Sequence, residues 1–194
     1  MNRKDQIIEA VVNKFREEGL STDLTMTEIA KAVDIGKSTI YEYFKSKDDL
    51  MKSALLKMSE NSIERIFNIE NIKNMKFEEA FKAQIIVLYQ IACESRMMFE
   101  VFSNDFKSQL PHAVQEEFVC KIHEVKDLIE QRFIMIMIKG VTEGIISMNE
   151  DPLSINVISG LVIGSMLRYS DADLNLDLHK FVDKVYEAVV KLGN

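Results

Sequence analysis

The sequence predicts an all-α protein of about nine helices, and three observations support this prediction. Apolar residues recur at spacings of three and four along most of the 194 residues, which is typical of amphipathic helices. Only two prolines and seven glycines interrupt the chain, whereas Glu, Lys, Leu, Met and Ala, which favour helix, are plentiful. Hydrophobic residues make up 47% of the chain and charged residues 28%, so the composition is that of a globular protein.

The first three expected helices follow one another closely. The first has an apolar stripe, and Gly19 offers it a left-handed stop. The second begins at a capping box, in which the Thr25 hydroxyl accepts from the amide of Glu28 and the Glu28 carboxylate reaches back. A tight turn at 34–36 separates it from the third. We expect these helices at about 3–18, 26–33 and 37–43.

The remaining helices are predicted from their caps and apolar faces. A second capping box, from Ser46 to Asp49, opens a longer helix. The run FIMIMI at 133–138 is ambiguous by periodicity alone, and its helical flanks favour helix. Asp151 and Pro152 read as an N-cap followed by a first-turn proline. The expected ranges are about 47–70, 77–94, 96–107, 111–147, 152–170 and 176–192.

Charge divides the chain into two parts. The formal net charge is -7, yet residues 1–47 hold eight Lys or Arg and eight Asp or Glu. The whole negative excess therefore lies in residues 48–194. Such asymmetry indicates two modules with different partners, a domain at 1–47 and another at 48–194.

Three features of the sequence predict the cellular compartment: the N-terminal residues, the length of the longest apolar stretch and the two cysteines. The N-terminus carries charge without the apolar core of a secretory signal. The longest uncharged apolar-rich stretch, 152–167, is too short to span a membrane. Cys93 and Cys120 each lie in an apolar periodic segment, so we expect two reduced, buried thiols. The sequence therefore predicts a cytoplasmic protein without a membrane partner.

A helix, a short helix, a three-residue turn and a second short helix are the arrangement of a helix-turn-helix, whose second short helix enters the major groove of DNA. Residues 36–47, GKSTIYEYFKSK, concentrate cations, hydroxyls and aromatic rings that suit phosphates, base edges and thymine methyls. Ile40 and Phe44 should face inward, and Tyr41 suits the groove better than Tyr43. The alternative, a solvated helix face, is disfavoured by the ordered caps and turn. The predicted DNA-binding residues are Thr25, Thr27, Lys37, Ser38, Thr39, Tyr41, Tyr43 and Lys47.

The run 25–50, TMTEIAKAVDIGKSTIYEYFKSKDDL, resembles the DNA-binding signature of TetR-type (tetracycline-repressor-like) transcriptional regulators. The rest of the chain is similar to that family only in length and helical layout. Two residues depart from the signature, because the usual turn Gly is Asp34 and the usual Ser before the reading helix is Gly36. Asp tolerates left-handed geometry, so the turn should form, whereas Gly36 removes a phosphate-binding hydroxyl. The matching residues are Thr25, Ile29, Ala30, Lys37, Thr39, Tyr41, Tyr43, Phe44, Lys47 and Leu50.

The resemblance implies an N-terminal helix-turn-helix three-helix domain and a C-terminal helical ligand-binding and dimerisation domain. The chain has 11 Met and 11 Phe, and Met-rich surfaces accept varied partners. We expect a pocket for an apolar or aromatic small-molecule effector, although each such residue could equally belong to an ordinary core. The predicted ligand-binding residues are Met58, Phe67, Tyr89, Cys93, Met97, Met98, Phe102, Phe106, Phe118 and Met135.

The resemblance also implies a homodimer formed by the last two helices. Gly160 and Gly164, four residues apart, would allow close helix approach, and the alternative is packing within one chain. A two-fold dimer would place its reading helices one helical turn of DNA apart and favour a palindromic operator. The predicted interface residues are Ile158, Leu161, Val162, Ser165, Phe181, Val185 and Val189.

An enzyme is not expected. His112, His123 and His179 lie far apart, and the sequence has no zinc-protease, nucleophile-elbow, phosphate-loop or dinucleotide motif. We expect no metal ion and no cofactor. The predicted function is a ligand-responsive repressor that leaves double-stranded operator DNA when its effector binds. The alternative is a small-molecule-binding or interaction protein that has lost operator reading, as the departures at Asp34 and Gly36 suggest.

Overall fold

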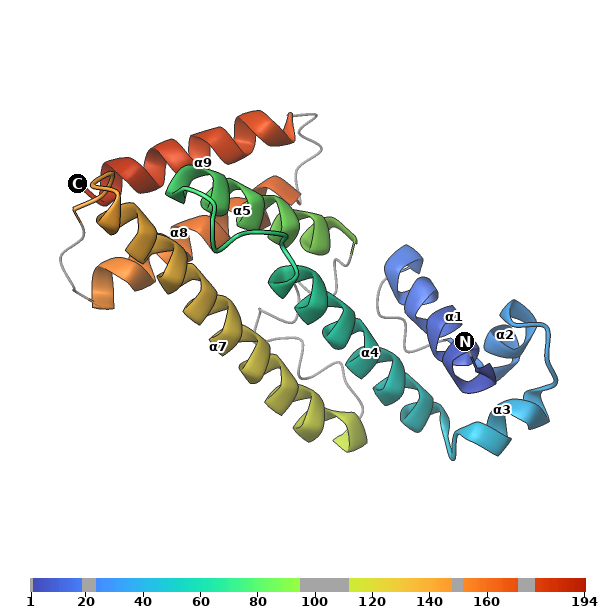
Figure 1. Ribbon diagram of the computed structural model, residues 1–194. Coiled ribbons are helices and arrows are strands. Elements are labelled where there is room, and N and C mark those ends of the chain that lie inside the picture. The colour runs from blue at the N-terminus through green and yellow to red at the C-terminus, as the bar shows by residue number, and fades with distance from the viewer. Residues whose placement is uncertain (1, 19–23, 95–111, 148–151, 171–176) are drawn as a thin grey trace. The chain divides into compact units, whose positions relative to one another are not determined.

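The all-α prediction is confirmed. The computed structural model describes residues 2–18, 24–94, 112–147, 152–170 and 177–194, which contain helices and no strand (Figure 1). The expected helix at 96–107 lies outside the described residues. The helices are α1 (Arg3–Glu18), α2 (Met26–Ala32), α3 (Lys37–Tyr43), α4 (Lys47–Phe67), α5 (Phe77–Glu94), α7 (His112–Thr142), α8 (Pro152–Ser170) and α9 (Leu178–Leu192).

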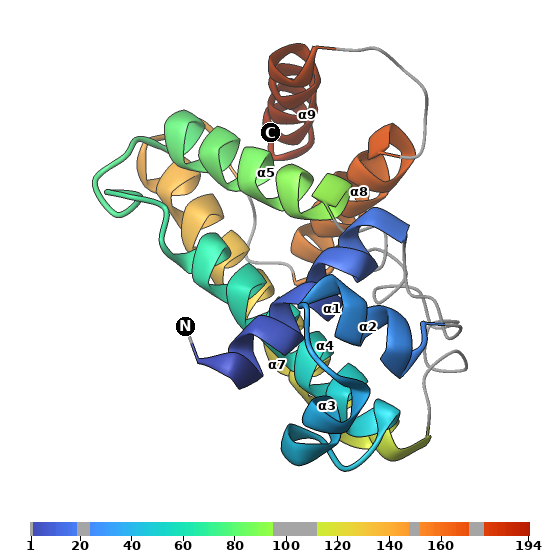
Figure 2. The same ribbon diagram turned by 90° about the vertical axis from the view of Figure 1, so that its right-hand side faces the viewer.

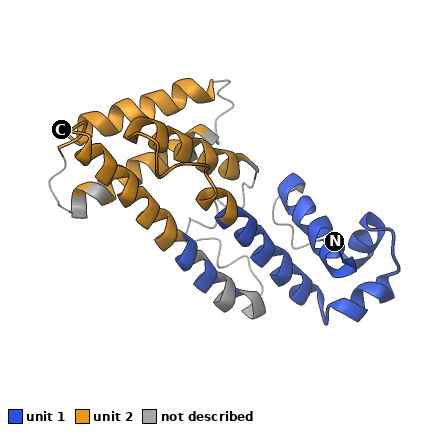
Figure 3. Ribbon diagram, in the orientation of Figure 1, with its two compact units in different colours: residues 1–63, 94–125 blue, residues 64–93, 126–194 orange. Residues whose placement is uncertain are grey.

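The chain forms two compact units (Figure 3). Unit 1 comprises residues 1–63 and 94–125, and unit 2 comprises residues 64–93 and 126–194. Helices α4 and α7 contribute residues to both units. This division follows packing, and the functional division at 47/48 remains a prediction.

Unit 1 is built around one core that α1, α2, α3 and α4 share (Figure 2). The apolar stripe of α1 is buried, together with one side of α2 and the start of α4. Ile40 and Phe44 are completely or almost completely buried, which confirms their predicted inward orientation. The short α3 therefore has one side in the core and the other at the surface. The largest contributors are Ile7, Phe15, Ile29, Ile40, Phe44, Leu50, Met51 and Leu55.

Both predicted capping boxes form, the second with a shifted partner. The Thr25 hydroxyl accepts from the amide of Glu28 at 3.2 Å, and the Glu28 carboxylate accepts from the amide of Thr25 at 2.8 Å. The Ser46 hydroxyl accepts from the amide of Asp49 at 3.1 Å. The Asp49 carboxylate accepts from the amide of Lys45 at 3.0 Å, one residue earlier than in the standard box. These bonds start α2 and α4 at the predicted residues.

The turn between α2 and α3 forms as predicted, because Asp34 adopts a left-handed φ of 51°. The amide of Ile35 donates to the Ala30 carbonyl at 3.0 Å, and the amide of Asp34 donates to the Lys31 carbonyl at 3.3 Å. These two bonds are those of a Schellman motif, which usually places glycine at the left-handed position. Aspartate takes that position here without loss of the turn.

Unit 2 packs α5, α8, α9 and the C-terminal part of α7 around aromatic rings. Phe81 on α5 lies 6.2 Å from Phe133 on α7 and 5.8 Å from Tyr186 on α9, measured between ring centroids. The amide of Phe77 donates to the Glu143 carboxylate at 2.9 Å and ties the start of α5 to the end of α7. Lys82 joins α5 to α9 through an ion pair of 2.6 Å with Asp183.

Some element ends differ from the predictions. Helix α4 ends at Phe67 rather than near 70, and α9 begins at Leu178 after its N-cap Asp177. Helix α7 ends at Thr142 rather than near 147, because Gly144 takes a φ of 69° in a second Schellman arrangement. The run 133–138 is helical, as predicted.

The predicted burial of the two thiols is wrong. Cys93 and Cys120 are both exposed and form no disulfide. Each lies on a helix with a broad apolar composition, where periodicity alone does not separate the buried from the exposed positions. Cysteine is also tolerated at the surface, so the residue type alone does not predict burial.

Candidate functional site

Helix α3 presents the predicted reading surface. Tyr41 and Tyr43 are 48% and 40% exposed, which is unusual for large aromatic side chains. Lys37 and Ser38 are also exposed, and Thr39 is half-buried. Cations, hydroxyls and aromatic rings therefore share the outer side of a helix whose inner side is fixed in the core.

Two neighbouring elements carry the other predicted DNA contacts. Thr25 and Thr27 are exposed at the start of α2, and Lys47 is half-buried at the start of α4. The Thr25 hydroxyl also donates to the Glu28 carboxylate at 2.8 Å, so it is already engaged within the protein. The structure thus places all eight predicted residues in unit 1, and their contact with DNA remains a prediction.

The capping box also affects charge near this surface. Hydrogen bonds from the Thr25 amide and hydroxyl hold the pKa of the Glu28 carboxyl below its ordinary value. Glu28 is therefore ionised at neutral pH, and its carboxylate accepts the two hydrogen bonds from Thr25 at the start of α2.

Gly36 is the N-cap of α3 and adopts an extended conformation, with φ -71° and ψ 146°. It supplies no side-chain cap. A Cβ atom built there would lie 3.4 Å from the Ser38 hydroxyl oxygen, an ordinary van der Waals distance. The backbone does not require glycine, so a serine would fit.

The predicted ligand-binding residues are spread over both units. Met58 belongs to the core of unit 1, whereas Phe67 and Tyr89 are half-buried in unit 2. Cys93 is exposed, and Met135 is about half exposed. Met97, Met98, Phe102 and Phe106 lie outside the described residues, as does the side chain of Phe118 in α7. A ligand role for these ten residues remains a prediction.

Tyr89 sits in an aromatic cluster of unit 2. Its ring lies 5.4 Å from Tyr169 and 6.0 Å from Phe181, and the latter two rings stack at 4.1 Å. A hydrogen bond to Cys93 and partial burial raise the pKa of Tyr89 to about 12. The phenol therefore stays protonated at neutral pH and remains engaged with Cys93.

Three polar residues of unit 2 were missed by the sequence analysis. Gln84 is 3% exposed, and neither atom of its amide group has a hydrogen-bond partner. Arg132 is 6% exposed with its Nε unpartnered, and the Ser159 hydroxyl is buried in the same way. An unsatisfied buried polar group costs about 1–3 kcal/mol, so these positions call for an explanation. Their sequence signal was a Gln inside an apolar face and an Arg next to an apolar run.

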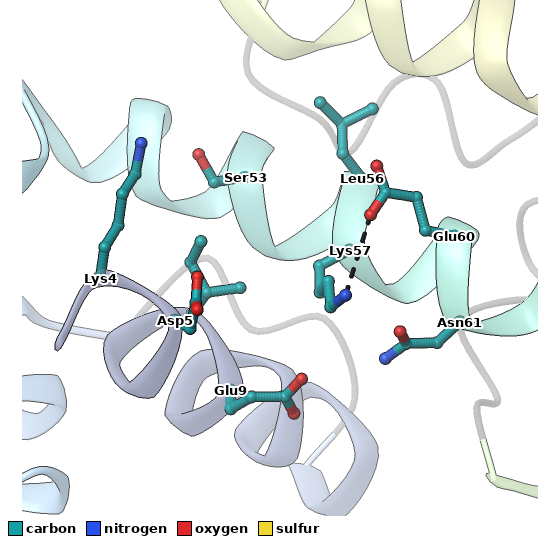
Figure 4. A pocket seen from close by; sticks show the side chains of 9 residues that line it. Lys4, Asp5, Glu9, Ser53, Leu56, Lys57, Glu60 and Asn61 are labelled. Atoms are coloured by element: carbon teal, nitrogen blue, oxygen red, sulfur yellow. Dashed lines mark ion pairs between the residues drawn. The ribbon is translucent and has the colours of Figure 1, made fainter. Parts of the chain in front are cut away.

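Unit 1 also contains a polar groove of about 650 Å³ between α1 and α4 (Figure 4). Its lining carries both signs of charge, including a Lys57–Glu60 ion pair of 3.9 Å. None of the predicted ligand-binding residues lines it. The lining residues are Lys4, Asp5, Ile8, Glu9, Ser53, Leu56, Lys57, Glu60 and Asn61.

The predicted dimer residues divide into two groups. Ile158, Val162, Val185 and Val189 are buried within the chain, and Leu161, Ser165 and Phe181 are half-buried. The outer side of α8 is instead formed by Val157, Gly160, Ile163 and Gly164, which are all exposed. Apart from the adjacent residues and the nearby backbone of α8 itself, no described atom lies within 4 Å of a Cβ built at Gly160 or Gly164. We name these four residues the outer face of α8.

The described residues contain no group of three or more His, Cys, Asp or Glu side chains arranged to hold a metal ion. None of their helices combines the length and apolar character that a membrane crossing needs.

A helix-turn-helix with an exposed polar and aromatic second helix, followed by a larger helical unit, defines the class of helix-turn-helix transcriptional regulators. The family model described as bacterial regulatory proteins, tetR family, matches residues 7–54. These residues include most of α1, all of α2 and α3, and the start of α4. Over this range the chain is similar to the tetR family of bacterial regulatory proteins, as the run 25–50 predicted.

One relative with a known sequence is similar to half of this chain. The uncharacterized HTH-type transcriptional regulator YuxN of Bacillus subtilis is 33% identical over 97 residues, which are 50% of this chain and 33% of YuxN. The chain therefore matches about a third of the length of that relative.

Solved structures share the fold over the whole chain. FadR from Bacillus subtilis, in complex with stearoyl-CoA, is 25% identical with a TM-score of 0.67, covering 97% of this chain and 98% of its own. A tetR-family regulatory protein from Rhodococcus RHA1 is 16% identical with a TM-score of 0.69, covering 100% of this chain and 98% of its own.

Proposed function

We propose that this regulator is a dimeric repressor that binds a palindromic operator through α3 and releases it when an effector binds its C-terminal domain. The observation that supports this most directly is the two-sided character of α3. Ile40 and Phe44 anchor the helix in the core, while Tyr41 and Tyr43 remain exposed beside Lys37. A groove-reading helix needs this combination of a fixed back and a polar, aromatic front.

The DNA-binding part is tested by titrating the protein with DNA from around its own coding region at two salt concentrations. We expect selective binding that weakens steeply with salt, because lysines displace counterions from phosphates. The double variant Tyr41→Ala, Lys47→Ala should lose selective binding. The control Lys73→Ala removes an exposed lysine between α4 and α5 and should bind like the wild type.

A folded protein without selective binding, even on a randomised DNA pool, would contradict the proposal. It would favour the alternative of a ligand-binding protein that has lost operator reading. In that case the absence of a hydroxyl at Gly36 would be the first feature to restore.

The effector is proposed to be apolar over most of its length. Stearoyl-CoA is bound by FadR, which is 25% identical over nearly the whole chain. Long-chain acyl compounds are therefore the first class to test. A second titration adds long-chain acyl-CoA to the operator-bound protein. Saturation with acyl-CoA should lower the affinity for DNA, and DNA should lower the affinity for acyl-CoA by the same factor. Unchanged DNA affinity at demonstrated acyl-CoA saturation would contradict the release mechanism.

The dimer is proposed to form through the outer face of α8. Exposed glycines four residues apart allow two helices to approach closely, and Val157 and Ile163 supply apolar surface beside them. This refines the predicted interface, because four of its seven residues are buried within the chain.

A further inference from the structure

We propose that the C-terminal site recognises an acidic group on its ligand, which Arg132 binds as the cation and Gln84 as a neighbouring hydrogen-bonding group. The inference rests on the proposed effector function and specifies which chemistry the effector must carry. It goes beyond an apolar ligand, because an apolar body alone leaves the Gln84 amide group and the Arg132 Nε without hydrogen-bond partners.

The first observation is Gln84. Its side chain lies on the buried side of α5, between the fully buried Phe81 and Ile85, and is 3% exposed. Both its amide nitrogen and its amide oxygen lack a partner. A glutamine in an otherwise apolar face is destabilising unless something completes its hydrogen bonds.

The second observation is Arg132 on α7. One guanidinium nitrogen donates to the Phe67 carbonyl at 3.0 Å, and the group lies 5.0 Å from the centroid of the Phe67 ring. Its Nε has no partner, and no carboxylate of the described residues pairs with it. Arginine keeps its charge when buried, and a buried charge normally has a counter-charge.

The packing of α5 against α7 brings these two residues to the same level. A Cβ at Gly140 would lie 3.0 Å from the ring of Phe77, and Phe133 lies 6.2 Å from Phe81 between centroids. Moving forward along α5 thus moves backward along α7. We infer from this register that Gln84, almost one turn beyond Phe81, lies level with the turn of α7 that precedes Phe133 and contains Arg132.

The hydrogen-bonding groups of Arg132 and Gln84 together favour an anionic group on the ligand. A guanidinium donates charge-assisted hydrogen bonds to carboxylate or phosphate oxygens, and an amide NH₂ adds a further donor. Buried water could satisfy Gln84 but would not neutralise Arg132. The Phe67 ring lies 5.0 Å from the guanidinium group, and the neighbouring Phe81 and Phe133 rings add apolar surface on α5 and α7. An acid with an apolar body therefore fits both parts.

The position of Arg132 also gives the anion a route to α4. The same guanidinium caps the last turn of α4 through the Phe67 carbonyl. An acidic ligand would compete for that guanidinium and change the C-terminal capping of the helix that begins directly after α3.

The test is calorimetric titration of the full chain, without DNA, with two pairs of matched ligands. Dodecanoate is compared with 1-dodecanol, and 2-naphthoate with 2-naphthol. At least one acid should bind more tightly than its alcohol. Arg132→Met should weaken binding of that acid by roughly ten- to a hundred-fold and leave the alcohol unchanged. Arg132→Lys, which keeps a cation, should restore part of the preference.

A third ligand distinguishes the source of the anion. Lauroyl-CoA carries phosphates instead of a free carboxylate, so its binding in place of dodecanoate, with the same dependence on Arg132, assigns the site to a phosphate. Equal affinities for both acids and their alcohols together with no Arg132-dependent binding of lauroyl-CoA, or an anion preference that survives Arg132→Met, would overturn the proposal. Failure of operator release would leave these results intact and refute only the proposed repressor mechanism.

Gln84→Met provides a readout that needs no ligand. Removal of an unpartnered amide should raise the melting temperature of the unliganded protein by roughly 2–4 °C while weakening binding of the acid. A fall in melting temperature would show that the amide is already satisfied in the unliganded protein and would overturn its assignment. This variant also tests the site if Arg132→Met fails to fold.

Discussion

Gly36 and Asp34 are the two residues at which the reading motif departs from its usual pattern, and they differ in consequence. Asp34 occupies a left-handed position that the turn requires, and the hydrogen bonds of the turn are intact. Gly36 occupies an extended position that any residue adopts, and a Cβ fits there. The first departure is therefore structurally silent, whereas the second removes a hydroxyl from the N-cap of α3.

Gly36→Ser should restore that hydroxyl. We expect DNA affinity to rise roughly two- to tenfold, the effect of one additional phosphate hydrogen bond, and stability to rise by a few tenths of a kcal/mol through the N-cap. Fluorescence anisotropy on the operator and thermal denaturation measure the two effects. Gly36→Ala adds the Cβ without the hydroxyl, and equal operator affinity of the Ser and Ala variants would contradict the explanation.

Glu28 is the residue whose charge is tied most directly to a helix end. Its folded pKa is lowered by the hydrogen bonds from Thr25, so its charge stabilises the folded protein above the ordinary glutamate pKa of about 4.3. That contribution is lost as the pH falls through the lowered folded pKa. The melting-temperature difference between wild type and Glu28→Gln should thus be constant near neutral pH and shrink in acid. Glu42→Gln, outside any capping box, is the control, and a difference that grows in acid would refute the assignment.

At the scale of the elements, helix starts were predictable because their signals are local. Thr25 with Glu28 and Ser46 with Asp49 lie within one turn of each other, and their side chains alone complete the caps. The end of α4 was less predictable, because it coincides with a tertiary partner. Phe67 ends α4 where its carbonyl meets Arg132, a residue 65 positions away. No local pattern reports such a partner.

Two helical glycines should respond oppositely to the same substitution. A Cβ at Gly140 would lie 2.9 Å from Ile146 and 3.0 Å from the buried Phe77 ring, whereas a Cβ at Gly160 meets nothing within 4 Å. Gly140→Ala should therefore destabilise the protein by about 1–3 kcal/mol through overpacking. Gly160→Ala should stabilise the isolated chain by about 0.5–1 kcal/mol through helix propensity. Urea unfolding of both variants provides the comparison, and equal effects would contradict the packing at Gly140.

At the scale of the whole molecule, the two parts of the function differ in how far they can be read from sequence. The exposed side of α3 could be predicted because α3 is short, follows a capped α2 and a tight turn, and has Ile40 and Phe44 as local apolar anchors. The proposed anion site could not, because Gln84 and Arg132 become unusual only when folding buries them with polar atoms left unpartnered. The predicted dimer residues remain a prediction, and periodicity did not separate the buried side of α8 from its exposed side.

The outer face of α8 gives the last prediction. Val157 is 56% exposed, so Val157→Glu should leave the fold of one chain intact. In a two-fold interface the same surface meets itself, and two new carboxylates would face each other there. We expect the dimer to dissociate at least tenfold more readily in sedimentation velocity, and operator affinity to fall with it, because one half-site contact is lost. Asn74→Glu adds the same charge on the segment between α4 and α5 and should remain dimeric. A Val157→Glu protein that stays dimeric would place the interface elsewhere and return the buried α8 and α9 residues to consideration.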